Sequence, residues 1–183
     1  MAGDGLQVRK ISSFKIYEDY STKGTIENDV AMVSLEDPLD FDDPEVQPMS
    51  SWKQTEPIQA NTYCLTIGCS QLRPSSNKFY ASQIVDGQVV SDESCRNVYE
   101  NFGTSIGPGM ICASKPCSNI RNKPCRGDSG SPLVCPDSLG RLKMVGLVSF
   151  GLTDCSRFPI IVYTRISHYQ DWISKQIENK NEF

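Results

Sequence analysis

Short apolar runs separated by turn residues fill the chain from about Thr62 to Thr164 and limit the folds available to it. The runs are CLTIG, KFYASQIV, GMICAS, PLVC, KMVGLVSF and IIVYTRI. Several short strands at such spacing are typical of an all-β barrel or sandwich. The chain has 183 residues, of which 38% are hydrophobic, so one domain with a packed core is expected.

The two ends of the chain differ from this central part. Residues 7–35 predict short strands around a polar turn, because Val, Ile, Phe and Tyr occupy the apolar positions. Residues 36–56 are rich in Asp, Glu and Pro, and we expect a linker or surface loop there. Near the C-terminus, Ser167 is expected to cap a helix. The apolar residues of that helix share one face: Tyr169, Trp172, Ile173 and Ile177.

The eight cysteines, an even number, favour disulfides and an oxidising compartment. Eight cysteines can pair in many ways, so spacing alone does not decide which residues are joined. Zinc binding is an alternative, because Cys64 and Cys69, and likewise Cys112 and Cys117, have four residues between them. The usual zinc knuckle has two intervening residues, and histidine partners are missing, so we predict no metal site.

The charge and hydropathy of the chain exclude two classes of partner. A net charge of −4 with scattered Lys and Arg argues against a nucleic-acid surface, which needs clustered basic residues. No apolar run approaches the roughly 18–20 residues of a membrane span. The first 17 residues lack the apolar stretch of a secretion signal, whereas the cysteines suit an exported protein. A piece of a secreted protein reconciles these observations.

The stretch GDSGSP at residues 127–132 is the strongest indication of chemistry. A serine hydroxyl such as that of Ser129 is a weak nucleophile near neutral pH, so it needs a base within hydrogen-bond reach, usually histidine. The chain has one histidine, His168, which follows Ser167 at the expected start of the helix. We expect His168 on the surface of that helix, which leaves the nucleophile without its base.

GDSGSP and several other segments, in the same order, resemble the trypsin/chymotrypsin family of serine proteases over roughly residues 7–178. The matching segments are NDVAM (28–32), VQP (46–48), CLTIG (64–68), VSFG (148–151), VYT (162–164) and WI (172–173). The resemblance implies an all-β, trypsin-like double β-barrel with a complete second barrel, a truncated first barrel and a C-terminal helix. Residues 1–56 would be the remnant of the first barrel and the linker. Residues 57–183 would be the second barrel with the helix, and the two parts together would form one partial protease domain.

The resemblance assigns catalytic roles by position. Ser129 would attack the scissile carbonyl, and Asp29 would orient a histidine. The amides of Gly127 and Ser129 would form the oxyanion hole, and Asp128 would pair with an N-terminal ammonium released by zymogen cleavage. The family segment that carries the histidine has no counterpart in these 183 residues. We therefore expect the chain to be inactive by itself.

The resemblance also implies substrate-binding residues. Ser149, Phe150 and Gly151 match the segment that pairs with substrate backbone. Lys123 stands where trypsins keep an aspartate, so it would repel basic substrate side chains. Ile161 stands where many members keep a pocket-lining glycine, so it would exclude large ones. Alternatively, Lys123 is a solvated loop residue and Ile161 belongs to the strand core.

Three family disulfides map onto this chain: Cys64–Cys135, Cys95–Cys112 and Cys125–Cys155. Cys69 and Cys117 remain, and we expect a fourth bridge between them because their loops border the same pocket in the family. Each bridge would stabilise the fold by about 2–4 kcal/mol, chiefly by restricting the unfolded chain.

Two functions stay open at this stage. The first is a trypsin-like serine endopeptidase homologue that acts by acyl transfer through Ser129 and is inactive as this truncated chain. The alternative is a non-catalytic homologue that binds a partner through the old substrate cleft. The missing histidine, Lys123 and Ile161 favour the alternative, and the retained Asp29 and Ser129 oppose it. A third hypothesis is that the sequence comes from an incomplete gene model or a splice form.

Both functions imply the same surroundings. We expect a protein or peptide as substrate or binding partner, no nucleic acid, no cofactor and an extracellular, secreted location. The sequence does not predict an oligomeric state.

Overall fold

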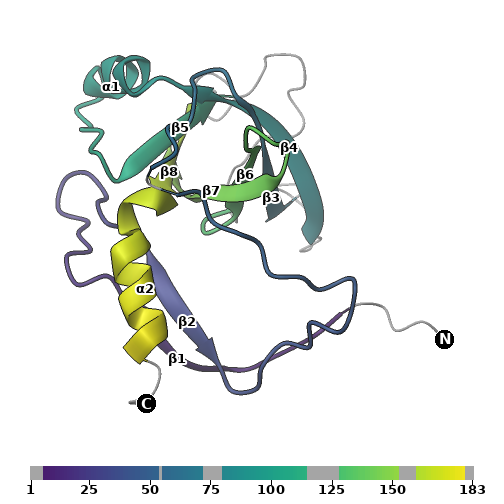
Figure 1. Ribbon diagram of the computed structural model, residues 1–183. Coiled ribbons are helices and arrows are strands. Elements are labelled where there is room, and N and C mark those ends of the chain that lie inside the picture. Colours follow the sequence, from purple (N-terminus) through teal and green to yellow (C-terminus); the bar gives the residue numbers. More distant parts are fainter. Residues whose placement is uncertain (1–5, 54, 72–79, 115–127, 153–159, 180–183) are drawn as a thin grey trace.

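A closed six-stranded barrel dominates the computed structural model, which describes residues 6–53, 55–71, 80–114, 128–152 and 160–179 (Figure 1). Its strands are β3 (Tyr63–Gln71), β4 (Tyr80–Val90), β5 (Met110–Ser114), β6 (Pro132–Pro136), β7 (Leu142–Gly151) and β8 (Ile160–Arg165). The order around the barrel is β3-β4-β5-β8-β7-β6, with antiparallel neighbours throughout. Each predicted apolar run overlaps one of these strands, so the prediction of a barrel is confirmed.

Large apolar side chains and a disulfide fill the barrel. The most deeply buried members of this core are Ile111, Leu133, Val145 and Tyr163. The disulfide between Cys64 and Cys135 lies in the same cluster. The hydroxyls of Tyr163 and Thr66 share a hydrogen bond of 2.8 Å, which satisfies both buried polar groups.

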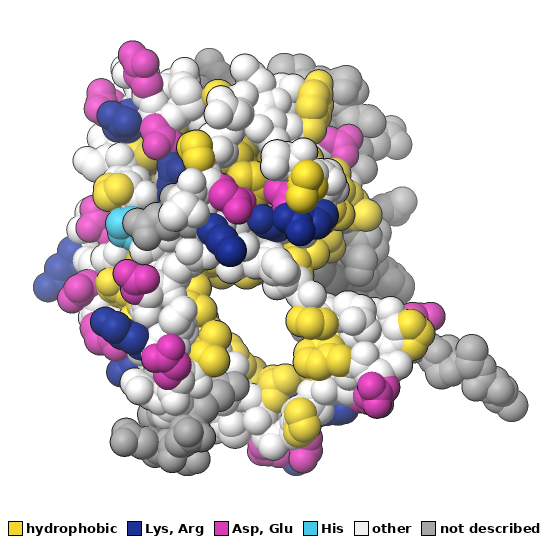
Figure 2. Space-filling model, in the orientation of Figure 1, with side chains coloured by type: hydrophobic (Ala, Val, Ile, Leu, Met, Phe, Trp, Pro, Cys, Tyr) yellow, Lys and Arg dark blue, Asp and Glu magenta, His cyan; other side chains and the backbone are white. Residues whose placement is uncertain are grey.

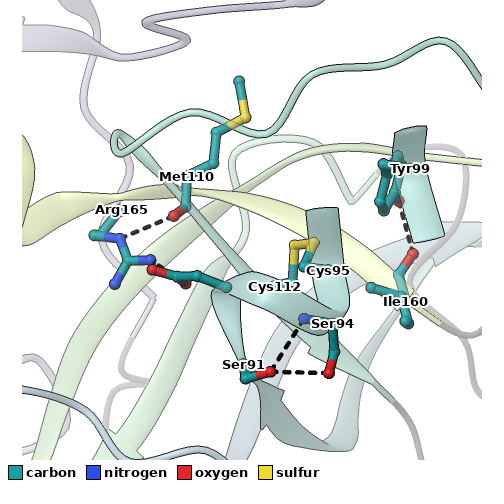
Figure 3. Close-up of a disulfide and its surroundings, with 9 residues drawn as sticks. Ser91, Ser94, Cys95, Tyr99, Met110, Cys112, Ile160 and Arg165 are labelled. Carbon is teal, nitrogen blue, oxygen red and sulfur yellow. Dashed lines mark hydrogen bonds and ion pairs between the residues drawn. A yellow bond between two sulfur atoms is a disulfide. The ribbon is translucent and has the colours of Figure 1, made fainter. Parts of the chain in front are cut away.

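A helix that the apolar pattern did not predict, α1 (Asp92–Glu100), packs beside the barrel (Figure 3). Its N-cap is Ser91, whose hydroxyl oxygen accepts a 3.1 Å hydrogen bond from the amide of Ser94. Asp92 and Glu93 in the first turn complement the positive end of the helix dipole. The helix therefore begins at a well-defined cap.

Two contacts fasten α1 to the barrel (Figure 3). The disulfide between Cys95 and Cys112 joins the helix to β5. The hydroxyl of Tyr99 donates a 2.9 Å hydrogen bond to the carbonyl of Ile160 at the start of β8. Both disulfides of the described residues match pairs implied by the family resemblance. The other cysteine side chains lie outside the described residues: Cys69, Cys117, Cys125 and Cys155.

The C-terminal part is a 3₁₀ helix, η1 (Ile166–Tyr169), that continues into α2 (Gln170–Glu178). A C-terminal helix is therefore confirmed, but the expected cap at Ser167 is wrong. Ser167 lies inside η1, and the residue before α2, Tyr169, makes no side-chain capping bond. The buried Ile166, 1% exposed, anchors η1 directly after β8, so packing starts this helix in place of a cap.

The N-terminal part forms a separate two-stranded antiparallel sheet of β1 (Ile11–Ile16) and β2 (Ala31–Leu35). Figure 1 shows α2 beside this sheet. The ring of Tyr17, just after β1, packs on the rings of Tyr169 and Trp172 at centroid distances of 5.2 and 5.3 Å. These aromatic contacts attach the small sheet to the C-terminal helices.

One face of the small sheet is apolar and uncovered. In register, Ile11 pairs with Leu35, Phe14 with Val33 and Ile16 with Ala31, and paired residues share a face. Phe14 is 68% exposed and Val33 is 48% exposed. Figure 2 shows hydrophobic side chains around an opening bounded by the N-terminal part of the chain and the barrel. In the segment 36–56, expected as a linker or surface loop, the described residues contain no helix or strand beyond an isolated bridge between Ser51 and Met144.

Candidate active site

Ser129 stands at the exposed tip of a β-turn that is attached to β7. The amide of Ser131 donates a 2.9 Å hydrogen bond to the carbonyl of Asp128 and closes the turn. Gly130, the third residue of the turn, has a φ of 81°, which a type II turn requires at this position. The amide of Gly130 donates to the carbonyl of Val148 at 2.8 Å, and the amide of Val148 donates to Ser131 at 2.9 Å. These two bonds fix the turn on β7.

Asp128 is buried at 2% exposure, whereas Ser129 beside it is exposed. Its carboxylate lies against Gly68 in β3, where a Cβ atom would collide with Oδ1. Burial raises the pKa of the neighbouring Tyr163 to about 12, and the negative charge of Asp128 acts in the same direction. The turn can approach β3 this closely only because residue 68 is glycine.

Asp29, just before β2, is held by two strands of the barrel. The hydroxyl of Ser149 in β7 donates a 2.6 Å hydrogen bond to Oδ2 of Asp29. The hydroxyl of Thr164 in β8 donates a 2.7 Å hydrogen bond to the backbone carbonyl of Asp29. The first bond orients the carboxylate and the second fixes the backbone that carries it. Hydrogen bonds to an ionised carboxylate are among the stronger ones in proteins.

A β-bulge directs Ser149 toward Asp29. Strands β7 and β8 are in register at Val148 with Tyr163 and again at Phe150 with Val162, so Ser149 has no register partner in β8. Bulges of this kind re-aim a side chain next to functional sites. Val148 fixes the Ser129 turn and Ser149 fixes Asp29. Consecutive residues of β7 thus anchor both of the predicted catalytic residues.

Phe150, Gly151 and Ile161, predicted to bind substrate, lie along the same pair of strands. The ring of Phe150 packs edge-on against Tyr99 with centroids 5.9 Å apart. Ile161 pairs with Gly151, and its Cδ1 atom lies 2.9 Å from where a Cβ on Gly151 would be. Ile161 is 9% exposed and belongs to the barrel core, so its side chain packs in the core and also covers Gly151.

The single histidine lies in a different environment. His168 is an exposed residue of η1, and its ring packs edge-on against Tyr169 at 4.9 Å. It borders a pocket together with Trp52 and Arg165. Within the part of the chain that the structure describes, His168 forms no hydrogen bond with Ser129 or Asp29. The expectation of an exposed His168 in a C-terminal helical segment agrees with this position.

Two contacts of the site were not predicted from the sequence. The sequence predicts Thr164 only as part of a strand motif and Ser149 only as a substrate-binding residue. Their hydroxyls hold Asp29 across sequence separations of 135 and 120 residues, which no local pattern reveals. Two other predicted residues, Lys123 and Gly127, lie outside the described residues.

The described residues offer no group of three or more His, Cys, Asp and Glu side chains arranged to hold a metal ion. Among the same residues, no helix is long and apolar enough to cross a membrane. Both disulfides and the fold indicate an extracellular or lumenal domain.

Comparison with known proteins gives one family. A family model described as Trypsin matches residues 2–173. Transmembrane protease serine 11G of Rattus norvegicus is 29% identical over 175 residues, covering 95% of this chain and 40% of that protein. Transmembrane protease serine 11C of Mus musculus is 29% identical over 168 residues, covering 92% of this chain and 38% of that protein. The chain spans about 40% of the length of these curated relatives. By this match and by its barrel, the chain belongs to the trypsin family of serine proteases.

Proposed function

We propose that the chain carries part of a serine endopeptidase site, in which Ser129 is the acyl-transfer nucleophile and Asp29 orients a histidine base. We further propose that the 183-residue chain does not hydrolyse peptide bonds by itself. Its partner would be an extracellular protein or peptide. The oxyanion hole would be formed by the amides of Gly127 and Ser129.

One observation supports this site above all others. The adjacent β7 residues Val148 and Ser149 anchor the Ser129 turn at 2.8 Å and the Asp29 carboxylate at 2.6 Å. A nucleophile and the carboxylate that orients its base must keep a fixed spacing, and a rigid strand can provide it. Ser129 is also exposed at the tip of its turn, so a scissile carbonyl can reach it.

The proposed inactivity rests on the position of the single histidine: among the described residues, no hydrogen bond joins Ser129 to a basic side chain. His168 packs on Tyr169 in η1, and Asp29 accepts its side-chain hydrogen bond from Ser149. Without a base, the hydroxyl proton of Ser129 has no acceptor when the oxygen attacks a carbonyl. Loss of the histidine costs about 10⁶-fold in kcat in a well-studied serine protease. Residual hydrolysis by this chain is therefore expected to be close to background.

Labelling with a fluorophosphonate tests both parts of the proposal. In this reaction the Ser129 oxygen bonds to phosphorus, fluoride leaves, and a base takes the serine proton. The oxidised chain should label only at background rate. Added imidazole should accelerate labelling, because it can accept the proton while donating its other N–H to Asp29. Intact-mass spectrometry measures the extent of labelling, and peptide mapping identifies the residue.

Two variants provide the controls. Ser129→Ala should abolish the imidazole-dependent labelling, whereas Ser131→Ala, in the same turn, should keep it. Stoichiometric labelling without imidazole would contradict the proposed inactivity. An imidazole-dependent rate equal to that of Ser129→Ala would contradict the proposed nucleophile.

A non-catalytic binding function is the second candidate, and the position of Ile161 favours it. Its Cδ1 atom covers Gly151 closely, so a substrate side chain has little room over that residue. A protein partner could still pair with the backbone of β7 near Phe150. Failure of labelling under both conditions would leave this function as the better account.

A further inference from the structure

We propose that Tyr169 is a positioning residue for Asp29: its hydroxyl, acting through the side chain of Asn28, fixes the backbone from which the Asp29 carboxylate reaches Ser149. This inference rests on the proposed role of Asp29 in orienting a base. Tyr169 does not touch Ser129 or Asp29 through a hydrogen bond, so its effect passes through Asn28.

Asn28 has an unusual backbone conformation directly before Asp29. Its φ is 54°, in the left-handed region, where Asn is tolerated better than most residues. Its carbonyl accepts a 2.8 Å hydrogen bond from the amide of Val30, so the chain turns tightly around Asp29. A small rotation at Asn28 would therefore swing the Asp29 side chain relative to Ser149.

Both ends of the Asn28 side-chain amide are anchored. The hydroxyl of Tyr169 donates a 3.0 Å hydrogen bond to Oδ1. The Nδ2 group donates a 2.9 Å hydrogen bond to the backbone carbonyl of Asp19. The Asp19 anchor belongs to the same polar turn between β1 and β2 as Asn28, and the Tyr169 anchor comes from η1. Tyr169 is thus the side-chain link that ties Asn28 to the barrel end of the molecule.

Tyr169 is itself held firmly enough to act as a reference point. It is 3% exposed, and its ring makes edge-on contacts with the rings of Tyr17 and His168 at centroid distances of 5.2 and 4.9 Å. Its hydroxyl passes over Gly109, where a Cβ atom would collide with it. Burial raises the pKa of Tyr169 to about 12, and the negative charges of Glu27 and Asp29 act in the same direction. The hydroxyl therefore remains a donor across the neutral pH range.

Thr164 of β8 and Tyr169 of η1 hold the backbone of Asp29 from its two sides. Thr164 holds the carbonyl of Asp29 at 2.7 Å, on the C-terminal side of the residue. Tyr169 holds the residue on its N-terminal side through Asn28 at 3.0 Å. With one contact on each side, the backbone of Asp29 is clamped, and the carboxylate keeps a single direction toward Ser149.

The test uses the full chain and the variant Tyr169→Phe, which keeps the ring and removes the hydroxyl. The matched control is Tyr17→Phe, in the same aromatic cluster, since no hydrogen bond joins its hydroxyl to Asn28. The readout is the side-chain carboxylate ¹³C resonance of Asp29 at neutral pH, with Ser149→Ala as the reference for a lost hydrogen bond. Tyr169→Phe should move the resonance toward the Ser149→Ala position, and Tyr17→Phe should leave it in place.

Asn28→Gly provides a second route to the same result, because glycine keeps the left-handed backbone and removes the amide that Tyr169 binds. It should move the resonance in the same direction as Tyr169→Phe. A purely structural role of Tyr169 in packing predicts no movement in either variant. A resonance of Tyr169→Phe that coincides with that of the wild-type chain overturns the inference.

Imidazole-dependent labelling of Ser129 separates this inference from the proposed function. Tyr169→Phe should slow the labelling by up to about 100-fold, the loss expected when a group is misplaced by about 1 Å. Tyr17→Phe should label at the wild-type rate. If the wild-type chain does not label at all, the proposed nucleophile fails, while the Asp29 resonance still decides the role of Tyr169.

Discussion

The closed barrel and the β1–β2 sheet both contain apolar strand residues, but these residues are mostly buried in the barrel and mostly exposed in the small sheet. In the barrel, Leu133 of β6 and Val145 of β7 are 0% and 2% exposed, because each strand has two neighbours and the interior is shared by all six. In the small sheet, every residue of β1 is exposed on both faces, and Phe14 is 68% exposed. Apolar strand residues alone do not make a core. A buried core forms where the sheet closes into a barrel.

The difference also concerns how each part is held. An isolated two-stranded sheet is marginally stable in water, and three or more strands or a packed helix are usually needed. The small sheet depends on the Tyr17 contacts with Tyr169 and Trp172 and on the bonds that hold Asp29. Asp29 thus belongs to the weaker part of the molecule, and Ser129 to the stronger part. The candidate site is built across the boundary between the two.

Hydrogen exchange should show the largest contrast between the two parts. The bonded amides of β5 and β8 should exchange only through global unfolding, whereas those of β1 and β2 should exchange through local opening. A difference of about 3 kcal/mol in opening free energy corresponds to roughly 100-fold in exchange rate. Exchange followed by NMR or mass spectrometry measures it. Equal protection in both sheets would mean that the small sheet unfolds only together with the barrel.

A leucine-to-alanine substitution in each sheet measures how much the apolar side chains of the two sheets contribute to the free energy of unfolding. Leu133→Ala removes a fully buried side chain from the barrel core and should lower the free energy of unfolding by about 2–5 kcal/mol. Leu35→Ala, in β2 at 37% exposure, should lower it by less than about 1 kcal/mol. Urea unfolding followed by circular dichroism gives both values. A comparable loss for Leu35→Ala would show that the apolar face of the small sheet is covered in solution.

The barrel could be predicted from the sequence because each of its strands is a short apolar run between turn residues. The α1 helix could not be predicted in this way, since only Cys95 and Tyr99 of its nine residues are buried. Its polar cap at Ser91 was the available signal. The cap expected at Ser167 failed for the opposite reason, because the buried Ile166 starts η1 without one.

In the candidate site, too, some features could be predicted from the sequence and others could not. Ser129 and Asp29 stand in local motifs that resemble those of the family, so both could be named from the sequence. The contacts that hold Asp29 in position could not be predicted from the sequence. They depend on the bulge at Ser149 and on Thr164 and Tyr169, each more than 100 residues away from the segment that it holds. Register and bulges arise from the paired strands, and neither strand shows them alone.

The last and smallest contrast in the free energy of unfolding tests how tightly the barrel is packed where β7 meets β8. A Cβ on Gly146 would lie 2.9 Å from the Cβ of Tyr163 and 3.3 Å from Cγ2 of Ile111. Gly146→Ala should therefore lower the free energy of unfolding by about 1–3 kcal/mol through overpacking.

Gly107→Ala is the matched control, because a Cβ there meets nothing within 4 Å and its φ is not in the left-handed region. It should leave stability unchanged or raise it by up to about 1 kcal/mol, since alanine restricts the unfolded chain more than glycine does. Thermal unfolding in parallel separates the two variants. If Gly146→Ala were as stable as Gly107→Ala, β7 would have room to shift. Val148 and Ser149 could then no longer be regarded as a rigid base for the Ser129 turn and Asp29.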